Sequence, residues 1–415
     1  MLDSPAYSGA FRADILAGGQ MALKPTDEDF DVIVIGGGPA GSAAAYTARQ
    51  NGLSVAVIDK KTFPRDKLCG ALFSSRSRDY YTEIFGRQLD PALFGPKNEI
   101  EFWLGGRKIG YMDDVPTLYV TMRWDLDHLC LGHAFEAGAV DMTGQAVAEI
   151  DEVGNAVAMK DGRRLGYKVL IGADGVNSMV ARTLYGRAFD HERIGFALEI
   201  ELDGDHLKPD EPVRIDFAAA KWGYGWEFPK PGTTTIGVGG IHSENPDMKA
   251  KMGDYLELLG IDRDVKRYKG HFLPFGDVRK KPGRGNIILA GDAAGLVDPI
   301  TGEGIAFALR SGQFAAEAAA ESLKPGISGS ALAIYKRKLK EIHRSLNIAR
   351  LIRPILSRPS GERAFEYMFT HSVTLKRQYM QLLGGELEYP TILKRVIRKL
   401  PQYLLVSIKR RSGAA

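Results

Sequence analysis

The chain has 415 residues, 44% hydrophobic and 26% charged, which is typical of a globular protein large enough for two or three domains. Its two cysteines, Cys69 and Cys130, stand in no CxxC or zinc-binding spacing, so the sequence predicts neither a disulfide framework nor a metal site. No signal peptide and no apolar run of about 18 residues is found, and we expect a cytoplasmic protein without a transmembrane helix.

Charge is distributed unevenly along the chain. The net charge is +4, but residues 336–415 hold 18 Lys and Arg against 5 Asp and Glu, so this segment carries +13 and the rest −9. Basic residues flank apolar ones over 391–411, which favours peripheral contact with an anionic membrane, on its inner face; a solvated helical face is the alternative. Nucleic-acid binding is not predicted, because aromatic residues are not interleaved with the basic ones.

The N-terminal part predicts a βαβ unit that holds a dinucleotide. A buried strand at 32–35 and an Ala-rich helix at 42–49 flank the GxGxxG motif of residues 36–41, and a second strand at 54–58 ends in Asp59. Gly36 permits the tight turn, Gly38 lets the backbone approach a pyrophosphate, and Gly41 allows close packing of the helix, whose N-terminus attracts the anion. Asp59 is placed to accept hydrogen bonds from an adenosine ribose.

The remaining elements indicate an insertion into this first domain. Apolar residues at helical spacing predict an amphipathic helix over 125–138. Alternating strands with Gly and Pro turns predict a β-rich domain between about 186 and 280. A buried strand at 286–290 and an Ala-rich helix ending near 323 return to the first domain, and residues 331–408 are predicted to be mainly helical with basic faces.

A second motif decides which dinucleotide is bound. Asp292 follows the strand at 286–290, where a carboxylate can hold ribitol hydroxyls, unless it merely caps a helix. The glycines of residues 302–304 open the next helix, whose N-terminus can stabilise negative charge on a reduced isoalloxazine. We therefore predict FAD. Because no second GxGxxG follows, we expect the reductant to be NAD(P)H or an electron-transfer protein that binds transiently.

Over most of residues 31–320 the chain resembles FAD enzymes of the para-hydroxybenzoate hydroxylase type, and in particular the geranylgeranyl reductase family. The matching segments are 36–41, 63–70 with its Cys-Gly pair, 123–127, 171–178 with its Asp-Gly pair, 221–230, which is similar to the family's Tyr-x-Trp-x-Phe-Pro motif, and 286–305. The resemblance implies flavin contacts at Ala40, Asp59, Cys69, Gly70, Arg123, Val147, Asp292, Gly304 and Ile305. The motifs add Gly36, Gly38, Gly41, Asp174, Gly291 and Gly302 to the predicted cofactor site.

This resemblance implies an α/β fold in which a discontinuous, Rossmann-like FAD-binding domain of the glutathione reductase or para-hydroxybenzoate hydroxylase type carries an inserted substrate domain. The predicted ranges are a flexible tail at 1–28, the FAD-binding domain at 29–100, 120–185 and 281–325, the β-rich substrate domain at 101–119 and 186–280, and a helical basic region at 326–415.

Four aromatic residues predict where the substrate lies. Side chains alternate along a strand, so Trp222, Tyr224, Trp226 and Phe228 are expected on one side as a wall for a long apolar substrate, unless they form an ordinary sheet core. Cys69 is the candidate for a catalytic contribution beside the flavin. Without the Cys-Gly motif, this cysteine would be interpreted as a small buried apolar residue. None of the eight histidines stands in a context that marks a general acid, and each is interpreted as structural or exposed.

The predicted activity is FAD-dependent reduction of carbon–carbon double bonds in a prenyl, isoprenoid-lipid or quinone-like substrate. A flavin monooxygenase or halogenase is the alternative, because those enzymes share the fold and the Phe-Pro-Arg segment. Cys69 and Gly70 stand where a halogenase is expected to have Gly-Glu-Ser. A flavoprotein that modifies or supports a partner protein, docked through the basic C-terminal region, is a further alternative.

Overall fold

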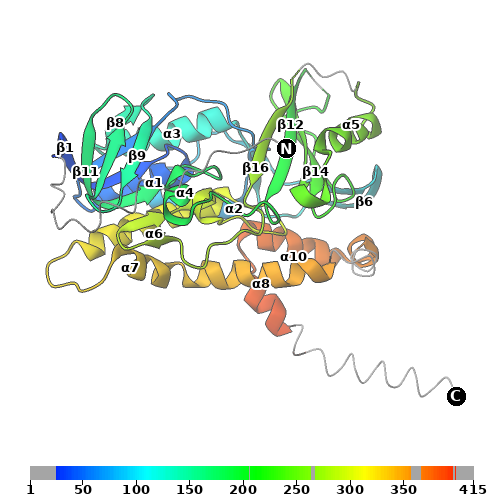
Figure 1. Ribbon diagram of the computed structural model, residues 1–415. Helices are drawn as coiled ribbons and strands as arrows, with labels where there is room; N and C mark the ends of the chain where they lie inside the picture. Colours follow the sequence, from blue (N-terminus) through cyan, green and yellow to red (C-terminus); the bar gives the residue numbers. More distant parts are fainter. Residues whose placement is uncertain (1–24, 205, 263–266, 357–365, 396–397, 399–415) are drawn as a thin grey trace, which may run out of the picture.

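The computed structural model describes residues 25–204, 206–262, 267–356, 366–395 and 398 (Figure 1). The predicted tail therefore lies outside the described residues except for 25–28, and so do most of the predicted helical residues after 395. Within the described residues the chain forms two large sheets, with long helices along the lower side of both (Figure 1).

The first sheet has eight strands and a parallel centre, as expected for a dinucleotide-binding fold. Its main order is β17 (Gly283–Arg284), β18 (Ile287–Leu289), β11 (Arg164–Gly172), β1 (Glu28–Ile35), β2 (Val55–Asp59) and β8 (Val140–Thr143), with all but β17 parallel. Strand β10 (Ala156–Met159) pairs antiparallel with β11, and β9 (Val147–Asp151) pairs antiparallel with β10. The late strand β18 lies beside β11, in the same sheet as β1 and β2.

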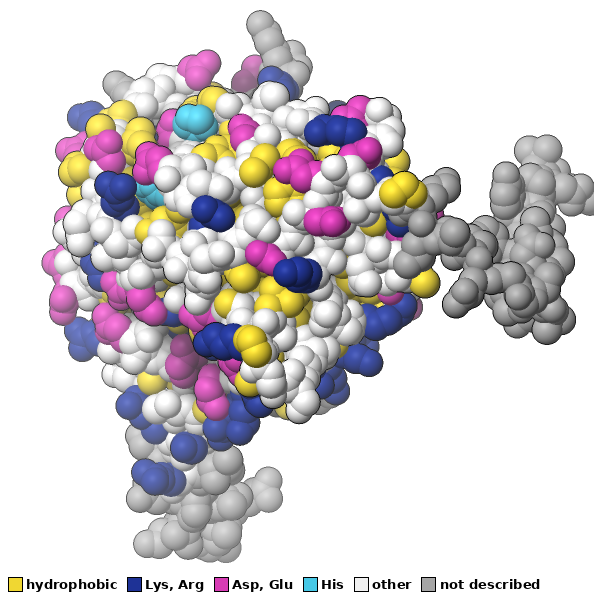
Figure 2. Space-filling view, turned by 90° about the vertical axis from the view of Figure 1, so that its left-hand side faces the viewer, with side chains coloured by type: hydrophobic (Ala, Val, Ile, Leu, Met, Phe, Trp, Pro, Cys, Tyr) yellow, Lys and Arg dark blue, Asp and Glu magenta, His cyan; other side chains and the backbone are white. Residues whose placement is uncertain are grey.

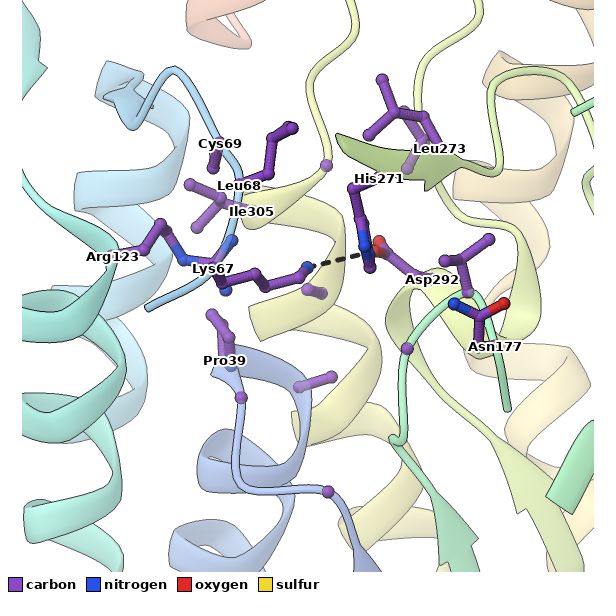
Figure 3. Close-up of a pocket in the computed structure, with 18 of the residues that line it drawn as sticks. Pro39, Lys67, Leu68, Cys69, Arg123, Asn177, His271, Leu273, Asp292 and Ile305 are labelled. Carbon is purple, nitrogen blue, oxygen red and sulfur yellow. Dashed lines mark ion pairs between the residues drawn. The ribbon is translucent and has the colours of Figure 1, made fainter. Parts of the chain in front are cut away.

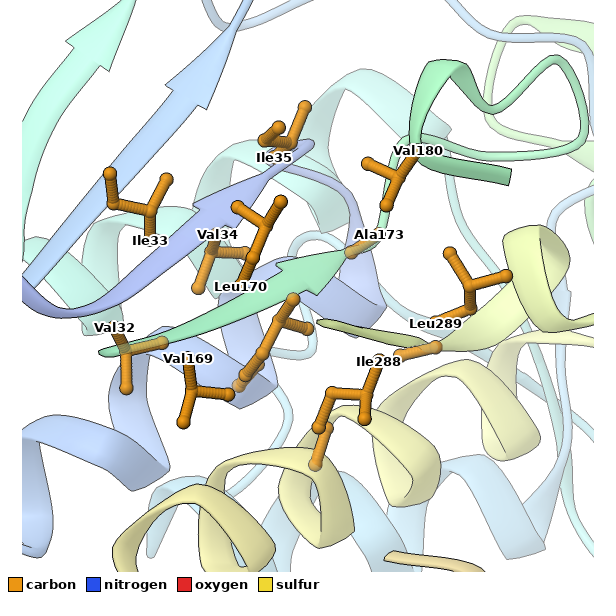
Figure 4. Packing of buried hydrophobic residues seen from close by; sticks show 14 of the residues in the cluster. Val32, Ile33, Val34, Ile35, Val169, Leu170, Ala173, Val180, Ile288 and Leu289 are labelled. Atoms are coloured by element: carbon orange, nitrogen blue, oxygen red, sulfur yellow. The ribbon is translucent and has the colours of Figure 1, made fainter. Parts of the chain in front are cut away.

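Continuous apolar runs form the centre of this domain. Val32, Ile33 and Val34 of β1 are completely buried, since both faces of the parallel sheet are covered. They pack with Leu170 of β11 and Ile288 of β18 (Figure 4). The helices of this part are α1 (Pro39–Gln50), α2 (Ser75–Phe85), α3 (Arg123–Glu136), α4 (Met179–Tyr185) and α6 (Ile305–Ser322), with a short 3-10 helix η2 (Gly291–Ala294).

The second sheet has seven strands, most of them antiparallel. Its order is β16 (Lys269–Leu273), β12 (Gly195–Asp203), β15 (Thr233–Ile241), β14 (Tyr224–Lys230), β13 (Val213–Asp216), β5 (Ile100–Leu104) and β6 (Arg107–Met112). Helix α5 (Met248–Leu258) packs on one face of this sheet. The turn at η1 (His242–Glu244) follows β15, and a small third sheet joins β3 (Leu72–Phe73), β7 (Leu118–Val120) and β4 (Gly95–Lys97).

The C-terminal helices lie below both sheets, in orange and red in Figure 1. They are α7 (Ala331–Lys338), α8 (Lys340–Leu356), α10 (Val373–Gly384) and a short helix at 389–395. Helix α10 adds Tyr379, Met380 and Leu383 to the apolar cluster on the second face of the seven-stranded sheet, which also holds Trp226 and Phe228 of β14. No helix among the described residues is both long and apolar enough to cross a membrane.

Candidate functional site

A cavity of about 680 Å³ lies where the two large sheets meet, at the carboxyl ends of the parallel strands. This edge is where open α/β sheets bind their ligands. The predicted cofactor residues that line it are Gly36, Gly38, Ala40, Asp59, Cys69, Gly70, Arg123, Val147, Asp174, Asp292, Gly302, Gly304 and Ile305. Gly41 and Gly291 are not among the lining residues, so the structure gives both of them a packing position behind the cavity wall.

The glycine motif joins β1 to α1 in the tight turn that the sequence predicts. Gly36 has φ +108°, and a Cβ there would lie 2.3 Å from the carbonyl oxygen of Ala173. A Cβ on Gly41 would lie 1.8 Å from the carbonyl oxygen of Gly36, so only glycine lets α1 start this close to the turn. Helix α1 begins with no side-chain cap, which leaves its first N–H groups free for an anion.

Asp59 connects this turn to the end of β2. Its two carboxylate oxygens accept hydrogen bonds from the backbone N–H groups of Gly37, at 2.8 Å, and Lys61, at 2.9 Å. These bonds fix the carboxylate at the cavity edge, and each oxygen retains capacity to accept another hydrogen bond from a hydroxyl.

Two arginines share one buried carboxylate at the start of α3. Arg123, at the start of α3, forms two hydrogen bonds to Asp127, of 2.9 and 2.8 Å, and Arg65 lies 3.1 Å from the same carboxylate. Burial lowers the pKa of Arg123, but Asp127 and Cys69 outweigh it and raise the value above normal. Two guanidinium groups against one carboxylate leave a net positive charge. This charge lies beside the glycine turn, because a guanidinium nitrogen of Arg65 is 3.5 Å from the position that a Cβ on Gly38 would take.

Asp292 follows β18 and faces the middle of the cavity, as Figure 3 shows. Its carboxylate forms an ion pair of 3.5 Å with Lys67, drawn as the dashed line in the same figure. His271 of β16 lies beside this pair. Burial, followed by the charge of Lys67, lowers the pKa of His271 to about 4, so the imidazole is neutral near pH 7.

Asp174 has a different arrangement from the other predicted acids. Its buried carboxylate accepts hydrogen bonds from the Ser178 hydroxyl at 2.5 Å and from the backbone N–H of Met179 at 2.6 Å, and it thereby caps α4. Burial raises its pKa. Asp174 therefore borders the cavity while its charge is directed at a helix N-terminus, and its predicted cofactor contact stays a prediction.

The Cys-Gly loop lies directly on the aromatic wall. A Cβ on Gly70 would lie 2.6 Å from the ring of Phe228 and 3.1 Å from the indole nitrogen of Trp226. The hydroxyl of Tyr224 donates a 2.9 Å hydrogen bond to the carbonyl of Thr301, in the glycine loop that precedes α6. The aromatic wall of β14 thus contacts two loops of the first domain at once.

The prediction that Trp222 belongs to this wall is wrong. Strand β14 begins at Tyr224, and Trp222 occupies a turn with φ +55°, where side-chain alternation does not apply. Its indole packs with Phe275, and the guanidinium of Arg353 stacks 5.4 Å from its ring. Trp222 is not among the lining residues, whereas Tyr224, Trp226 and Phe228 are.

Gly225, between the aromatics Tyr224 and Trp226 of β14, makes room for a helix. A Cβ on Gly225 would lie 2.6 Å from the ring of Tyr255, which belongs to α5 on the far face of the sheet. Gly225 therefore lets α5 pack closely against β14.

Several lining residues were not predicted from the sequence. His271 and Lys269 come from β16, and Tyr379 and Leu383 come from α10, far along the chain. The interpretation of every histidine as structural or exposed is wrong for His271, which faces the cavity. No local motif marks these residues, because only strand pairing and helix packing bring them to the site.

Comparison with known proteins places this arrangement in a class. A family model described as pyridine nucleotide-disulphide oxidoreductase matches residues 30–194. The chain is 32% identical over 320 residues to a menaquinone reductase of Mycobacterium tuberculosis, covering 70% of this chain and 76% of the relative. It is 30% identical over 315 residues to a geranylgeranyl diphosphate reductase of Rhodobacter capsulatus, covering 72% of this chain and 76% of the relative.

Solved structures show the same fold. A geranylgeranyl bacteriochlorophyll reductase-like protein from Thermoplasma acidophilum superposes with a TM-score of 0.73 at 23% identity, over 89% of this chain and 99% of that one. A flavin-dependent brominase superposes with a TM-score of 0.68 at 21% identity, over 90% and 100% of the two chains. At these identities the likeness extends to the fold alone, and the fold serves both reductases and halogenases.

Fold and site together define an FAD-dependent oxidoreductase. Within that class, the chain belongs to the geranylgeranyl reductase family. The relative from Rhodobacter capsulatus shows this, because the match covers 76% of that relative at 30% identity. The predicted fold class, family and FAD dependence are confirmed.

The residues present fit the cofactor. Two helices, α1 and α6, begin at this cavity, and glycines precede both; α1 has no side-chain cap, while Glu303 accepts a hydrogen bond of 3.0 Å from the backbone N–H of Ala306 in the first turn of α6. Gly36, Gly38 and Asp59 would hold the pyrophosphate and adenosine end, and Asp292 with Gly304 would hold the ribitol and isoalloxazine end. A cavity with one anion-binding turn and one carboxylate at each end in this arrangement is what a dinucleotide requires.

Proposed function

We propose that the protein reduces carbon–carbon double bonds in a long apolar substrate of the prenyl, isoprenoid-lipid or quinone-like kind. The observation that carries this proposal is the contact between the Cys69–Gly70 loop and the aromatic wall of Trp226 and Phe228 inside the cofactor cavity. Apolar side chains continue from this point, because Ile215 and Leu383 line the same cavity. Relatives named menaquinone reductase and geranylgeranyl diphosphate reductase support the same class of substrate.

FAD, when bound, supplies the hydride that one alkene carbon receives. The protein residues bind and orient the substrate: Trp226 and Phe228 offer flat apolar surface to an isoprenoid chain, and the Cys69–Gly70 loop sets how close the chain can come. Burial of these groups excludes water from the reacting atoms. Cys69 lines the cavity and is our candidate for a local contribution to the reaction.

Hydride transfer needs only the reduced flavin and a proton, so the reaction is expected to proceed without oxygen. Purified holoenzyme, reduced chemically under nitrogen, should convert geranylgeranyl diphosphate or menaquinone into a product that gains two hydrogens for each bond reduced, as mass spectrometry would show. If turnover requires O₂ and the product contains a new oxygen atom, the monooxygenase or halogenase alternative replaces this proposal. We propose NAD(P)H or an electron-transfer protein as the natural reductant, because the sequence has one GxGxxG motif.

A peripheral position on an anionic membrane, on its cytoplasmic face, is also proposed for the C-terminal region. Leu351, Tyr367 and Val373 are each more than 60% exposed, which is unusual for large apolar side chains gathered in one part of a chain. Lys394 and Arg395 are exposed beside Leu393. Figure 2 shows Lys and Arg side chains gathered at the lower end of the molecule. A lipid substrate would be collected from such a surface.

The alternative of a flavoprotein that supports a partner protein would use the same basic region as its docking surface. Vesicle binding separates the two, because a partner-binding surface does not require anionic lipid.

A further inference from the structure

A buried carboxyl group lies behind the Cys69–Gly70 loop. Glu199 belongs to β12 and has no exposed surface, and its Oε1 accepts a hydrogen bond of 3.3 Å from the backbone N–H of Cys69. Strand β15 lies between β12 and β14, and its residue Gly237 is the cross-strand partner of both Glu199 and Trp226. Residues paired across strands point to the same face, so the side chains of Glu199 and Trp226 stand on one face of the sheet. The row that carries the aromatic wall therefore continues to this carboxyl.

Glu199 has little around it to stabilise a negative charge. Its Oε2 has no hydrogen-bond partner in the part of the chain that the structure describes. A carboxylate buried with one long hydrogen bond costs more free energy than a neutral carboxyl in the same place. Burial, followed by the charge of Glu201, raises the pKa of Glu199 to about 8, although Lys230 and Lys269 act in the opposite direction.

The neighbouring cations are held by other groups. Lys269, which pairs with Glu199 across the sheet, lies 3.0 Å from Asp66 and 3.7 Å from Glu201. Lys230 on β14 donates to the sulfur of Met122 at 3.2 Å, and burial lowers its pKa. Neither lysine forms an ion pair with Glu199 among the described residues, so near pH 7 the carboxyl is mainly protonated.

We propose that Glu199 is a positioning residue that controls the Cys69 thiol through its own protonation. In the neutral form, Oε1 holds the Cys69 N–H and adds no charge, while the guanidinium of Arg123 faces the thiol. In the ionised form, a negative charge next to Cys69 disfavours the thiolate. The proposal rests on the proposed function in one respect: if the protein reduces a prenyl-type substrate, Cys69 lies beside that substrate.

The test measures how fast iodoacetamide alkylates Cys69 in the purified holoenzyme between pH 6 and pH 9.5. The other cysteine, Cys130, is fully buried, and a Cys69→Ser variant gives the background rate. Below pH 7, Glu199→Gln should react at the wild-type rate, since both side chains are neutral there. Above pH 8, Glu199→Gln should react several-fold faster than the wild type, because only the wild type then carries the opposing charge.

The matched control is Glu201→Gln. Glu201 stands two residues further on the same face, and its carboxylate accepts a 2.7 Å hydrogen bond from the Thr235 hydroxyl. Because the charge of Glu201 helps to raise the pKa of Glu199, this variant should keep the fall in reactivity above neutral pH and move it to a lower pH, whereas Glu199→Gln abolishes it. Superimposable profiles of wild type and Glu199→Gln over the whole range would overturn the proposal, and so would an equal change in both variants.

A second measurement keeps the proposal testable if Glu199→Gln does not fold. Infrared difference spectra of the wild-type minus a Glu199→Leu holoenzyme cancel other buried carboxyls with raised pKa values, such as Glu227, and should contain the band of a protonated carboxyl at pH 6 that is lost as the pH rises past about 8. A site that is ionised throughout contradicts the proposal. Neither experiment uses a substrate, so a failure of the proposed reductase activity would leave these results unaffected.

Discussion

Replacing Glu199 with Gln should change how the stability of the protein depends on pH. The folded pKa of this carboxyl is about 8 against 4.5 for the free side chain. Below pH 4.5 both the folded and unfolded states hold the proton, and the group contributes nothing. Between pH 4.5 and 8 only the unfolded chain releases the proton, so the wild type loses stability as the pH rises, and above 8 the loss is complete.

The size of this loss follows from the pKa difference. About 3.5 pH units at roughly 1.4 kcal/mol each amount to about 5 kcal/mol above pH 8, about 3 kcal/mol at pH 7, and less than about 1 kcal/mol at pH 5. Glu199→Gln lacks the titration, so its free energy of unfolding should rise relative to the wild type by these amounts as the pH increases. A constant offset from the new amide is expected at every pH and does not alter the slope.

The assay is urea unfolding of both holoenzymes at pH 5, 7 and 9 with FAD in fixed excess, followed by circular dichroism and by flavin fluorescence. Fixed FAD is needed because ligand binding itself shifts the unfolding midpoint. Glu201→Gln serves as the control for loss of a carboxyl on the same strand. Parallel stability curves for wild type and Glu199→Gln would refute the assignment of a buried, largely neutral carboxyl behind Cys69.

Three further outcomes are expected. Gly38→Val should give colourless protein, because a branched side chain would stand between the backbone and the pyrophosphate; a visible flavin spectrum at wild-type occupancy would contradict this. Trp226→Ala should retain FAD while catalytic efficiency with a prenyl substrate falls at least tenfold and stability drops by about 3 to 5 kcal/mol, and loss of FAD in the same variant would count against a substrate role. Deletion of residues 391–415 should weaken sedimentation with anionic vesicles at low salt with FAD still bound; equal binding by both proteins would exclude this segment as the anchor.

The sequence by itself determined the elements that depend on short-range patterns. The glycine motif, the apolar runs of β1 and β18 and the acids after β2 and β18 predict the cofactor cavity, because a turn, a buried strand and a helix N-terminus each leave a local signature. The family resemblance added Cys69 and Gly70, and the structure places both at the cavity.

Only the tertiary structure decided which distant residues complete that cavity. Trp222 failed the alternation rule because it lies in a left-handed turn before β14 begins at Tyr224, a conformation that periodicity does not reveal. His271 reaches the cavity, and Glu199 reaches the backbone of Cys69, because β16 and β12 pair side by side, and Tyr379 lines the cavity because α10 packs its ring against Phe102 of β5. Their unusual pKa values follow from burial, which depends on every element around a side chain and is therefore not written in any one segment.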